Sequence, residues 1–273
     1  MIEAKSEKLW NYISRDAKVE RVATGFGFVE GPVFSRLGFL LFSDLRQERI
    51  FRWERGKLTV FRDKSNHANG LTFDHQGRLL TCEKGRVTRT EKNGAITVLA
   101  GEGLEGPNDL VYAIDGSLYF TDFPKGRVYQ VTRERSGVGG TADKGTVRVV
   151  SEDGEGPNGV ALAPKQQKLY VADYRKKLIR VYGIKADGTL EKGRDFANAQ
   201  GDGLKTDEAG NVWVADGEKG VTVFDPNGEM LGIVNTPEAP ANLNWGGGFR
   251  GLYITARTSV YHVPSKVNGT RTF

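Results

Sequence analysis

The chain has 273 residues, of which 38% are hydrophobic and 36 are glycine, and it carries a formal net charge of +5. Such a composition suits a turn-rich globular protein, and no run approaches the roughly 20 apolar residues that a membrane-spanning helix needs. Basic residues are scattered and do not line one face beside aromatic side chains. We therefore expect neither a nucleic acid nor a membrane as a partner.

The first seventeen residues are expected to form an arm. Residues 1–8 lack the apolar core of a signal peptide, and Leu9, Trp10 and Ile13 stand at helical spacing, which predicts a short helix packed on the main domain. The single cysteine, Cys82, cannot form an internal disulfide, which fits a reducing compartment. We expect a cytoplasmic protein with an arm over residues 1–17 and one domain over residues 18–273.

One hairpin pattern then repeats along the chain. In residues 158–173 a short apolar strand is followed by a polar turn and a second strand that ends in a carboxylate. The pattern occurs six times, with steps of 39, 39, 50, 44 and 39 residues between copies. The copies begin at Glu30, Asn69, Asn108, Asn158, Asp202 and Ala241. A period near 40 with strand-like segments is typical of β-propeller blades, which have about four strands each.

The two ends of the chain are expected to complete one blade. The last copy has a third strand over residues 259–263 but no fourth, whereas residues 19–23 alternate in polarity and belong to no copy. Pairing these segments would remove two open sheet edges. The sequence therefore predicts an all-β, six-bladed propeller whose last blade is closed by an N-terminal strand. The glycine-rich stretch 135–145 is expected to be a hairpin loop, and residues 246–248 a turn.

The first position of each copy points to a metal site. The first strand of every blade lines the channel of a propeller, and five of the six first positions carry a side-chain oxygen. Such ligands favour a hard cation, and calcium, which takes six to eight oxygens in flexible geometry, fits better than magnesium. We predict one divalent cation, with calcium favoured and magnesium, manganese and zinc left open. The predicted ligands are Glu30, Asn108, Asn158 and Asp202.

A second set of carboxylates ends the second strands, at Asp44, Glu83, Asp122, Asp173 and Asp216. A hairpin returns to the end where it started, so these groups are expected to border the same mouth of the channel. Most are interpreted as holding loops through backbone N–H groups, while Asp173 and Glu83 remain candidates for contacting a substrate. Asn69 and His67, which precede the second copy's strand, are expected to bind substrate with Asp173.

These motifs resemble the senescence marker protein/gluconolactonase/luciferin-regenerating family, over roughly residues 18–263. The resemblance rests on residues 30–32 (Glu-Gly-Pro), 69–74 with 77–80, 107–110 (Pro-Asn-Asp-Leu), 157–159 (Pro-Asn-Gly) and 202–203 (Asp-Gly). It implies a six-bladed propeller with a divalent cation, usually calcium, in its channel, and a role for Asn108 in contacting substrate or metal. Some animal members carry an arginine at the position of Gly106, so their way of gripping substrate hydroxyls is not expected here.

The resemblance implies a calcium-dependent hydrolase that opens sugar lactones such as gluconolactone. The cation would polarise the lactone carbonyl and a carboxylate would activate water. Asp202 is the first choice for this catalytic base, with Asp109, Asp173 and Glu83 left open. The alternatives are a related hydrolase of organophosphate-type esters and a non-enzymatic propeller that binds proteins. A small-molecule lactone is the expected partner, and the sequence does not predict an oligomeric state.

Overall fold

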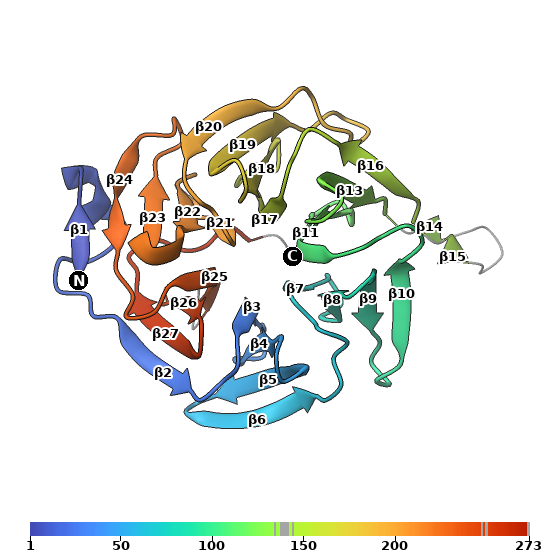
Figure 1. Cartoon of the computed structure of the whole chain (residues 1–273), viewed down its shortest axis with the longest axis horizontal. Coiled ribbons are helices and arrows are strands. Elements are labelled where there is room, and N and C mark those ends of the chain that lie inside the picture. The colour runs from blue at the N-terminus through green and yellow to red at the C-terminus, as the bar shows by residue number, and fades with distance from the viewer. Residues whose placement is uncertain (134, 137–141, 144, 247, 249–250, 272–273) are drawn as a thin grey trace.

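The computed structural model describes residues 1–133, 135–136, 142–143, 145–246, 248 and 251–271. Within these residues, six antiparallel sheets of four or five strands surround a central channel (Figure 1). The predicted six-bladed propeller is therefore confirmed. The short hairpin of β14 (Arg135–Ser136) and β15 (Ala142–Asp143) projects beyond the third blade. The predicted loop at 135–145 and turn at 246–248 lie partly outside the described residues.

Four blades are built from consecutive or nearly consecutive strands. Blade 1 comprises β3 (Val29–Phe34), β4 (Leu40–Asp44), β5 (Arg49–Glu54) and β6 (Lys57–Arg62). Blade 2 comprises β7 (Leu71–Phe73), β8 (Leu79–Glu83), β9 (Arg86–Thr90) and β10 (Ile96–Ala100). Blade 3 comprises β11 (Pro107–Tyr112), β12 (Leu118–Asp122), β13 (Arg127–Val131) and β16 (Val147–Ser151). Blade 4 comprises β17 (Pro157–Leu162), β18 (Lys168–Asp173), β19 (Leu178–Gly183) and β20 (Arg194–Asn198).

The last two blades each take a strand from the N-terminal part of the chain. Blade 5 comprises β21 (Leu204–Thr206), β22 (Val212–Ala215), β23 (Val221–Phe224), β24 (Met230–Val234) and the edge strand β1 (Ile2–Ala4). Blade 6 comprises β25 (Pro240–Gly246), β26 (Gly251–Ala256), β27 (Ser259–Pro264) and β2 (Glu20–Thr24). The pairing of β2 with β27 confirms the predicted closure of the last blade by an N-terminal strand.

The N-terminal arm differs in detail from the prediction. The helix is a 3-10 turn, η1 (Glu7–Asn11), and a second such turn, η2 (Gly217–Lys219), follows β22. Leu9 and Ile13 are fully buried against blades 5 and 6, as their spacing suggested. The strand β1 was not predicted, because three residues carry too little pattern to identify a strand. The division of the chain at residue 17 stays a prediction.

The hydrophobic core lies between the blades. Among the described residues, six clusters of buried side chains each join two neighbouring sheets. Between blades 3 and 4, for example, Val111 and Tyr119 pack with Val160 and Leu169. Burying one such side chain contributes about 1.5–3 kcal/mol. Because both faces of each inner strand are covered, these strands read as short apolar runs between turns, which is why their repeat was visible in the sequence.

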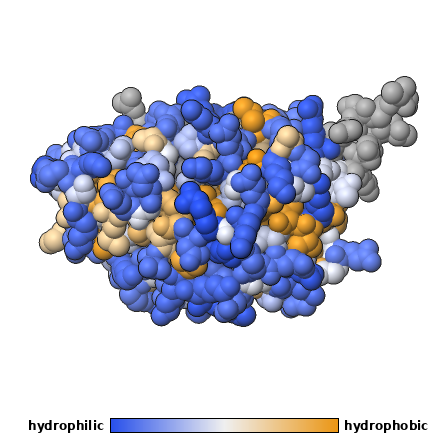
Figure 2. All heavy atoms as spheres, turned by 90° about the horizontal axis from the view of Figure 1, so that it is seen from above, coloured by the Kyte–Doolittle hydropathy of each residue, from blue (hydrophilic) through white to orange (hydrophobic). Residues whose placement is uncertain are grey.

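Some hydrophobic residues of the outer strands are exposed on the surface of the propeller. Seen edge-on, the molecule has polar rims with hydrophobic residues in a band between them (Figure 2). The exposed hydrophobic residues on outer strands include Leu58, Val60, Ile96 and Val98. Within the described residues, the helical segments are all too short and polar to cross a membrane.

The inner strands change register where the channel begins. Four inner hairpins have a register shift, at Glu30/Val33, Pro107/Leu110, Pro157/Val160 and Pro240/Asn242. Such a bulge re-aims the side chains around it. These shifts coincide with the first position in four of the six copies, so they orient Glu30, Asn108 and Asn158 among the predicted ligands; Asp202 instead precedes β21.

Candidate functional site

The first positions of neighbouring copies are tied together by backbone hydrogen bonds. The N–H groups of Gly70, Gly159 and Gly203 donate to the carbonyl oxygens of Asn108, Asp202 and Ala241, at 2.8, 2.8 and 2.7 Å. Glycine is required because a Cβ atom on Gly159 would lie 2.5 Å from the Asp202 carbonyl oxygen. The inner ends of neighbouring blades therefore approach each other closely at the first positions, which lie around one end of the channel.

Three of the four predicted metal ligands interact with one another. Asn158 donates a side-chain hydrogen bond to Asp202, and the charges of Asp202 and Glu30 repel each other. Glu30 is only 3% exposed, Asn158 is buried and Asp202 is half-buried. The fourth predicted ligand, Asn108, is also half-buried, and its carbonyl oxygen accepts the N–H group of Gly70 in the neighbouring blade.

The surroundings of Glu30 and Asp202, the two acids among the predicted ligands, disfavour a negative charge. Burial raises the pKa of Glu30 well above its usual range, and repulsion from Asp202 and Asp109 raises it further. Burial raises the pKa of Asp202 to about 7, an effect that the hydrogen bond from Asn158 opposes and the charge of Asp109 reinforces. A cation placed beside these two acids would stabilise their ionised forms. The raised pKa values therefore indicate a place where a positive charge would be favourable.

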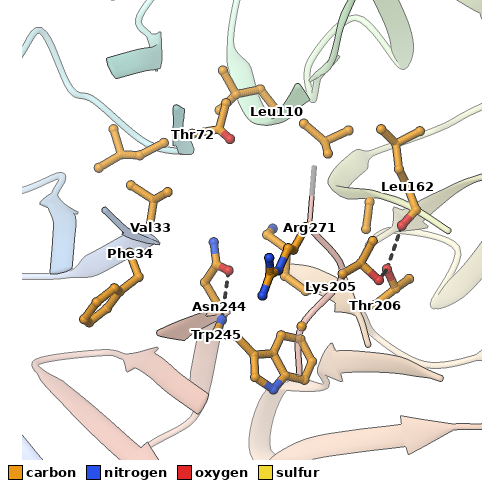
Figure 3. A pocket seen from close by; sticks show the side chains of 15 residues that line it. Val33, Phe34, Thr72, Leu110, Leu162, Lys205, Thr206, Asn244, Trp245 and Arg271 are labelled. Atoms are coloured by element: carbon orange, nitrogen blue, oxygen red, sulfur yellow. Dashed lines mark hydrogen bonds between the residues drawn. The ribbon is translucent and has the colours of Figure 1, made fainter. Parts of the chain in front are cut away.

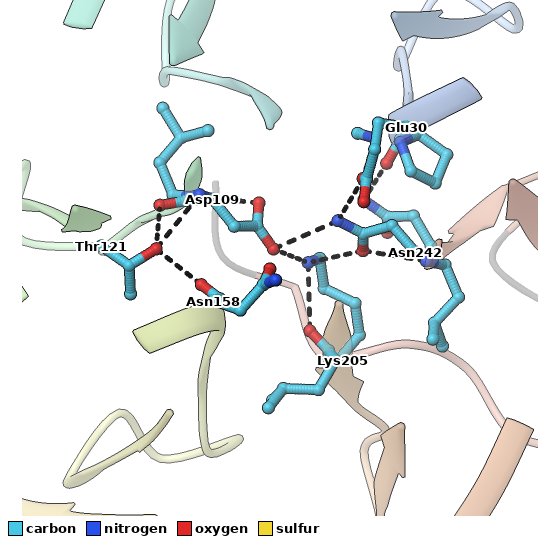
Figure 4. A network of polar contacts seen from close by, with 12 residues as sticks. Glu30, Asp109, Thr121, Asn158, Lys205 and Asn242 are labelled. Atoms are coloured by element: carbon cyan, nitrogen blue, oxygen red, sulfur yellow. Dashed lines mark hydrogen bonds and ion pairs between the residues drawn. The ribbon is translucent and has the colours of Figure 1, made fainter. Parts of the chain in front are cut away.

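A network that the sequence did not reveal joins Glu30 to side chains of blades 3, 5 and 6 (Figure 4). Asn242 Nδ2 donates to Glu30 Oε2 at 3.0 Å and to Asp109 Oδ2 at 3.3 Å. Lys205 Nζ lies 3.1 Å from Asp109 Oδ2 and 3.5 Å from Asn242 Oδ1. Blade 6 therefore does contribute a polar side chain to the site, one residue after Ala241, the apparent exception in the repeat.

One signal in the sequence identifies two members of this network. The second position of the repeat is glycine in four copies, at Gly31, Gly70, Gly159 and Gly203, but it is Asp109 in the third and Asn242 in the sixth. A side chain at Gly203 would collide with Asn242, since its Cβ would lie 2.1 Å from Asn242 Cγ. The two non-glycine positions therefore face each other across the channel. Lys205 had no comparable signal.

The predicted substrate residues lie in three different settings. Asn69 is half-buried, and its Oδ1 atom is buried with no hydrogen-bond partner among the described residues. The side chain of His67 is 48% exposed, with Nδ1 3.3 Å from the Leu45 carbonyl and Nε2 3.4 Å from Glu48. Asp173 is buried at the end of β18 and accepts the backbone N–H groups of Glu155, Gly156 and Lys176. A substrate contact for each of the three stays a prediction.

The other carboxylates that end second strands hold loops, as interpreted from the sequence. Asp44 accepts four backbone N–H groups, Asp122 two and Asp216 one. Glu83 instead accepts the side chains of Arg62, Arg86 and Thr88. These buried acids fix the turns that surround the mouth of the channel.

The opposite end of the channel is lined by the C-terminal segment. Thr270 N–H donates to the Thr206 carbonyl at 2.9 Å, and Gly269 pairs with Asp207. A cavity of about 50 Å³ remains there, bordered by the ends of the inner strands and by Arg271 (Figure 3). The C-terminal segment therefore narrows this end of the channel.

The donor set fits the predicted cation. Carboxylate and amide oxygens are the ligands that calcium takes, and the four predicted ligands supply only these two kinds of oxygen. Within the residues that the structure describes, no group of three or more His, Cys, Asp or Glu side chains is arranged to hold a metal ion. A cation here would therefore depend on the amides of Asn108 and Asn158 as well as on the two acids.

Comparisons with known proteins agree with these features. A family model described as the SMP-30/Gluconolactonase/LRE-like region matches residues 28–258. A gluconolactonase from Zymomonas mobilis is 28% identical over 92% of this chain and 82% of its own. A pentonolactonase from Haloferax volcanii is 28% identical over 68% and 66%. The solved gluconolactonase from Xanthomonas campestris superposes with a TM-score of 0.87 at 28% identity, covering 97% of this chain and 94% of that one.

Proposed function

The chain belongs to the SMP-30/gluconolactonase/LRE-like family, and from this premise we propose that it is a calcium-dependent hydrolase that opens sugar lactones. The relatives that act on gluconolactone and pentonolactones support the reaction class. The observation that carries the proposal for this chain is the meeting of Glu30, Asn158 and Asp202 at one mouth of the channel. A single site there would bind both the cation and the lactone.

Each residue has a distinct role in the proposed mechanism. Glu30, Asn108, Asn158 and Asp202 would hold the cation, which when bound supplies a Lewis acid for the lactone carbonyl. Asn69, His67, Asn108 and Asp173 would bind substrate hydroxyls and orient the ring. Asp202 would accept a proton from the attacking water, a contribution of about 10²–10⁴-fold for a general base.

Acid release from a panel of lactones and phosphoesters, with and without a chelator, tests the proposal. We expect hydrolysis of aldonolactones, its loss on chelation and its recovery when calcium is added back. Turnover of phosphoesters alone would overturn the lactonase assignment. Lactone hydrolysis that persists in metal-free protein would instead overturn only the requirement for a cation.

Replacing Asn69 with alanine tests whether this residue recognises the hydroxyl groups of the substrate. A substrate hydroxyl that donates to the buried Asn69 Oδ1 contributes about 0.5–1.5 kcal/mol. We therefore expect KM for gluconolactone to rise about two- to tenfold, with little change for δ-valerolactone, which lacks the hydroxyls. Steady-state kinetics on both substrates measures the difference. Equal changes in the two KM values would show that Asn69 does not recognise the sugar.

A further inference from the structure

Lys205 is an ammonium group enclosed in the channel. It lies on β21, three residues after Asp202, and its side chain is only 15% exposed. Lysine is almost never buried without a partner, and here Nζ has three acceptors: Asp109 Oδ2 at 3.1 Å, the Leu204 carbonyl at 3.0 Å and Asn242 Oδ1 at 3.5 Å. Because these acceptors match its three N–H donors, the group is a fixed positive charge.

The charge of Lys205 is connected to the proposed ligands through Asp109. Asp109 Oδ2 contacts Lys205 and also accepts from Asn242 Nδ2, which in turn donates to Glu30 Oε2. Asp109 is thus linked to Glu30 through a single side chain, that of Asn242, and it directly follows Asn108, another proposed ligand. Any change in the pairing of Asp109 will therefore change the electrostatic potential at the proposed site of the cation (Figure 4).

The number of charges in this enclosed cluster indicates what Lys205 does. In their ionised forms Glu30, Asp109 and Asp202 carry three negative charges, and one ammonium reduces them to two. That remainder matches a divalent ion, whereas without the ammonium the cluster would match a trivalent one. Charges interact more strongly among partly buried groups than in water, so such a mismatch lowers the affinity for the ion.

We propose that Lys205 sets the charge of the cation that the channel accepts, by pairing with Asp109 and leaving two unneutralised carboxylates for a divalent ion. The inference rests on the proposed function because it takes Glu30 and Asp202 as ligands. Lys205 is then a positioning residue with an electrostatic role: it touches neither the cation nor the substrate but decides which ion is bound.

A double-mutant cycle measured by metal binding tests this role. Calcium affinity by calorimetry and terbium affinity by luminescence are determined for the wild type, Lys205→Met, Asp109→Asn and the double variant. Lys205→Met is expected to raise the ratio of terbium to calcium affinity at least about tenfold, because one more negative charge favours the trivalent ion. Asp109→Asn is expected to weaken calcium binding by about the same factor. The double variant restores the number of charges, so both affinities should return close to wild type.

The outcomes separate this inference from simpler ones. Lys205→Arg keeps the charge and should keep the wild-type ratio. A purely structural role predicts that the double variant binds calcium worse than either single variant, and that result would overturn the inference. If the single variant Lys205→Met does not fold, comparing the calcium affinities of Asp109→Asn and the double variant still tests the inference. Wild-type protein that binds neither ion would end both this inference and the proposed cation, whereas calcium binding with an unchanged ratio in every variant would end this inference alone.

Discussion

Replacing Glu30 with glutamine is expected to weaken calcium binding at least about 100-fold and to abolish lactone hydrolysis at low calcium, while the propeller stays folded. Removing a group that only supports a metal ligand typically costs 10–100-fold in affinity, and Glu30 is proposed as a charged ligand itself. Glutamine keeps an oxygen that can accept from Gly31 N–H and Asn242 Nδ2, which now lie 2.7 and 3.0 Å from Glu30 Oε2. Burial already disfavours the charge of Glu30, so the metal-free variant should unfold at the same or a higher temperature than wild type.

Asp44→Asn is the matched control for this experiment. Asp44 lies on the neighbouring strand of the same blade, is fully buried and accepts the backbone N–H groups of Gly27, Phe28, Arg46 and Gln47. An amide nitrogen among these donors leaves buried groups unpaired and should cost about 1–3 kcal/mol of stability. Calorimetry and thermal unfolding should therefore give opposite patterns: Glu30→Gln loses calcium and keeps stability, while Asp44→Asn loses stability and keeps calcium. Unchanged calcium affinity in Glu30→Gln would remove Glu30 from the proposed ligand set.

The repeated architecture could be predicted because each blade is encoded locally. A hairpin with an apolar first strand, a polar turn and a terminal carboxylate is complete within about 20 residues, and its recurrence gave the number of blades. The closure by residues 20–24 was also predictable, since an unpaired strand pattern at one end of the chain matched a missing strand at the other. The edge strand β1 has no such counterpart in the sequence, and its pairing with β24 is evident only in the structure.

The network of Asp109, Lys205 and Asn242 could not be predicted from one copy of the repeat. Its members come from blades 3, 5 and 6, and their contacts join positions as far as 133 residues apart in the chain. Asp109 and Asn242 stand where four other copies have glycine, which marks them as unusual but does not say what they contact. Lys205 lies on the inner strand β21, and nothing in the sequence around it indicates which side chains its ammonium group contacts in the channel.

The candidates for the catalytic base differ in how many partners hold them. Asp109 is engaged by Leu110 N–H, Lys205 and Asn242, and Asp173 by three backbone N–H groups. Glu83 is paired with two arginines. The Asp202 carboxylate is held by the Asn158 side chain and is half-buried, so it retains more acceptor capacity facing the channel than the other acids. This difference favours Asp202 for taking a proton from water.

Replacing Asp202 with asparagine should therefore lower kcat at least about 100-fold even at saturating calcium, within the range that loss of a general base costs. The amide keeps an oxygen for the cation but cannot accept a proton, so added calcium can restore binding without restoring turnover. Glu30→Gln provides the contrast, because excess calcium should recover much of its kcat if Glu30 serves only as a ligand. Measuring kcat across a calcium titration for both variants separates the two roles. If Asp202→Asn turns over lactone at nearly the wild-type rate once calcium is saturating, Asp202 is a ligand only, and the proton must pass to Asp109, Asp173 or Glu83.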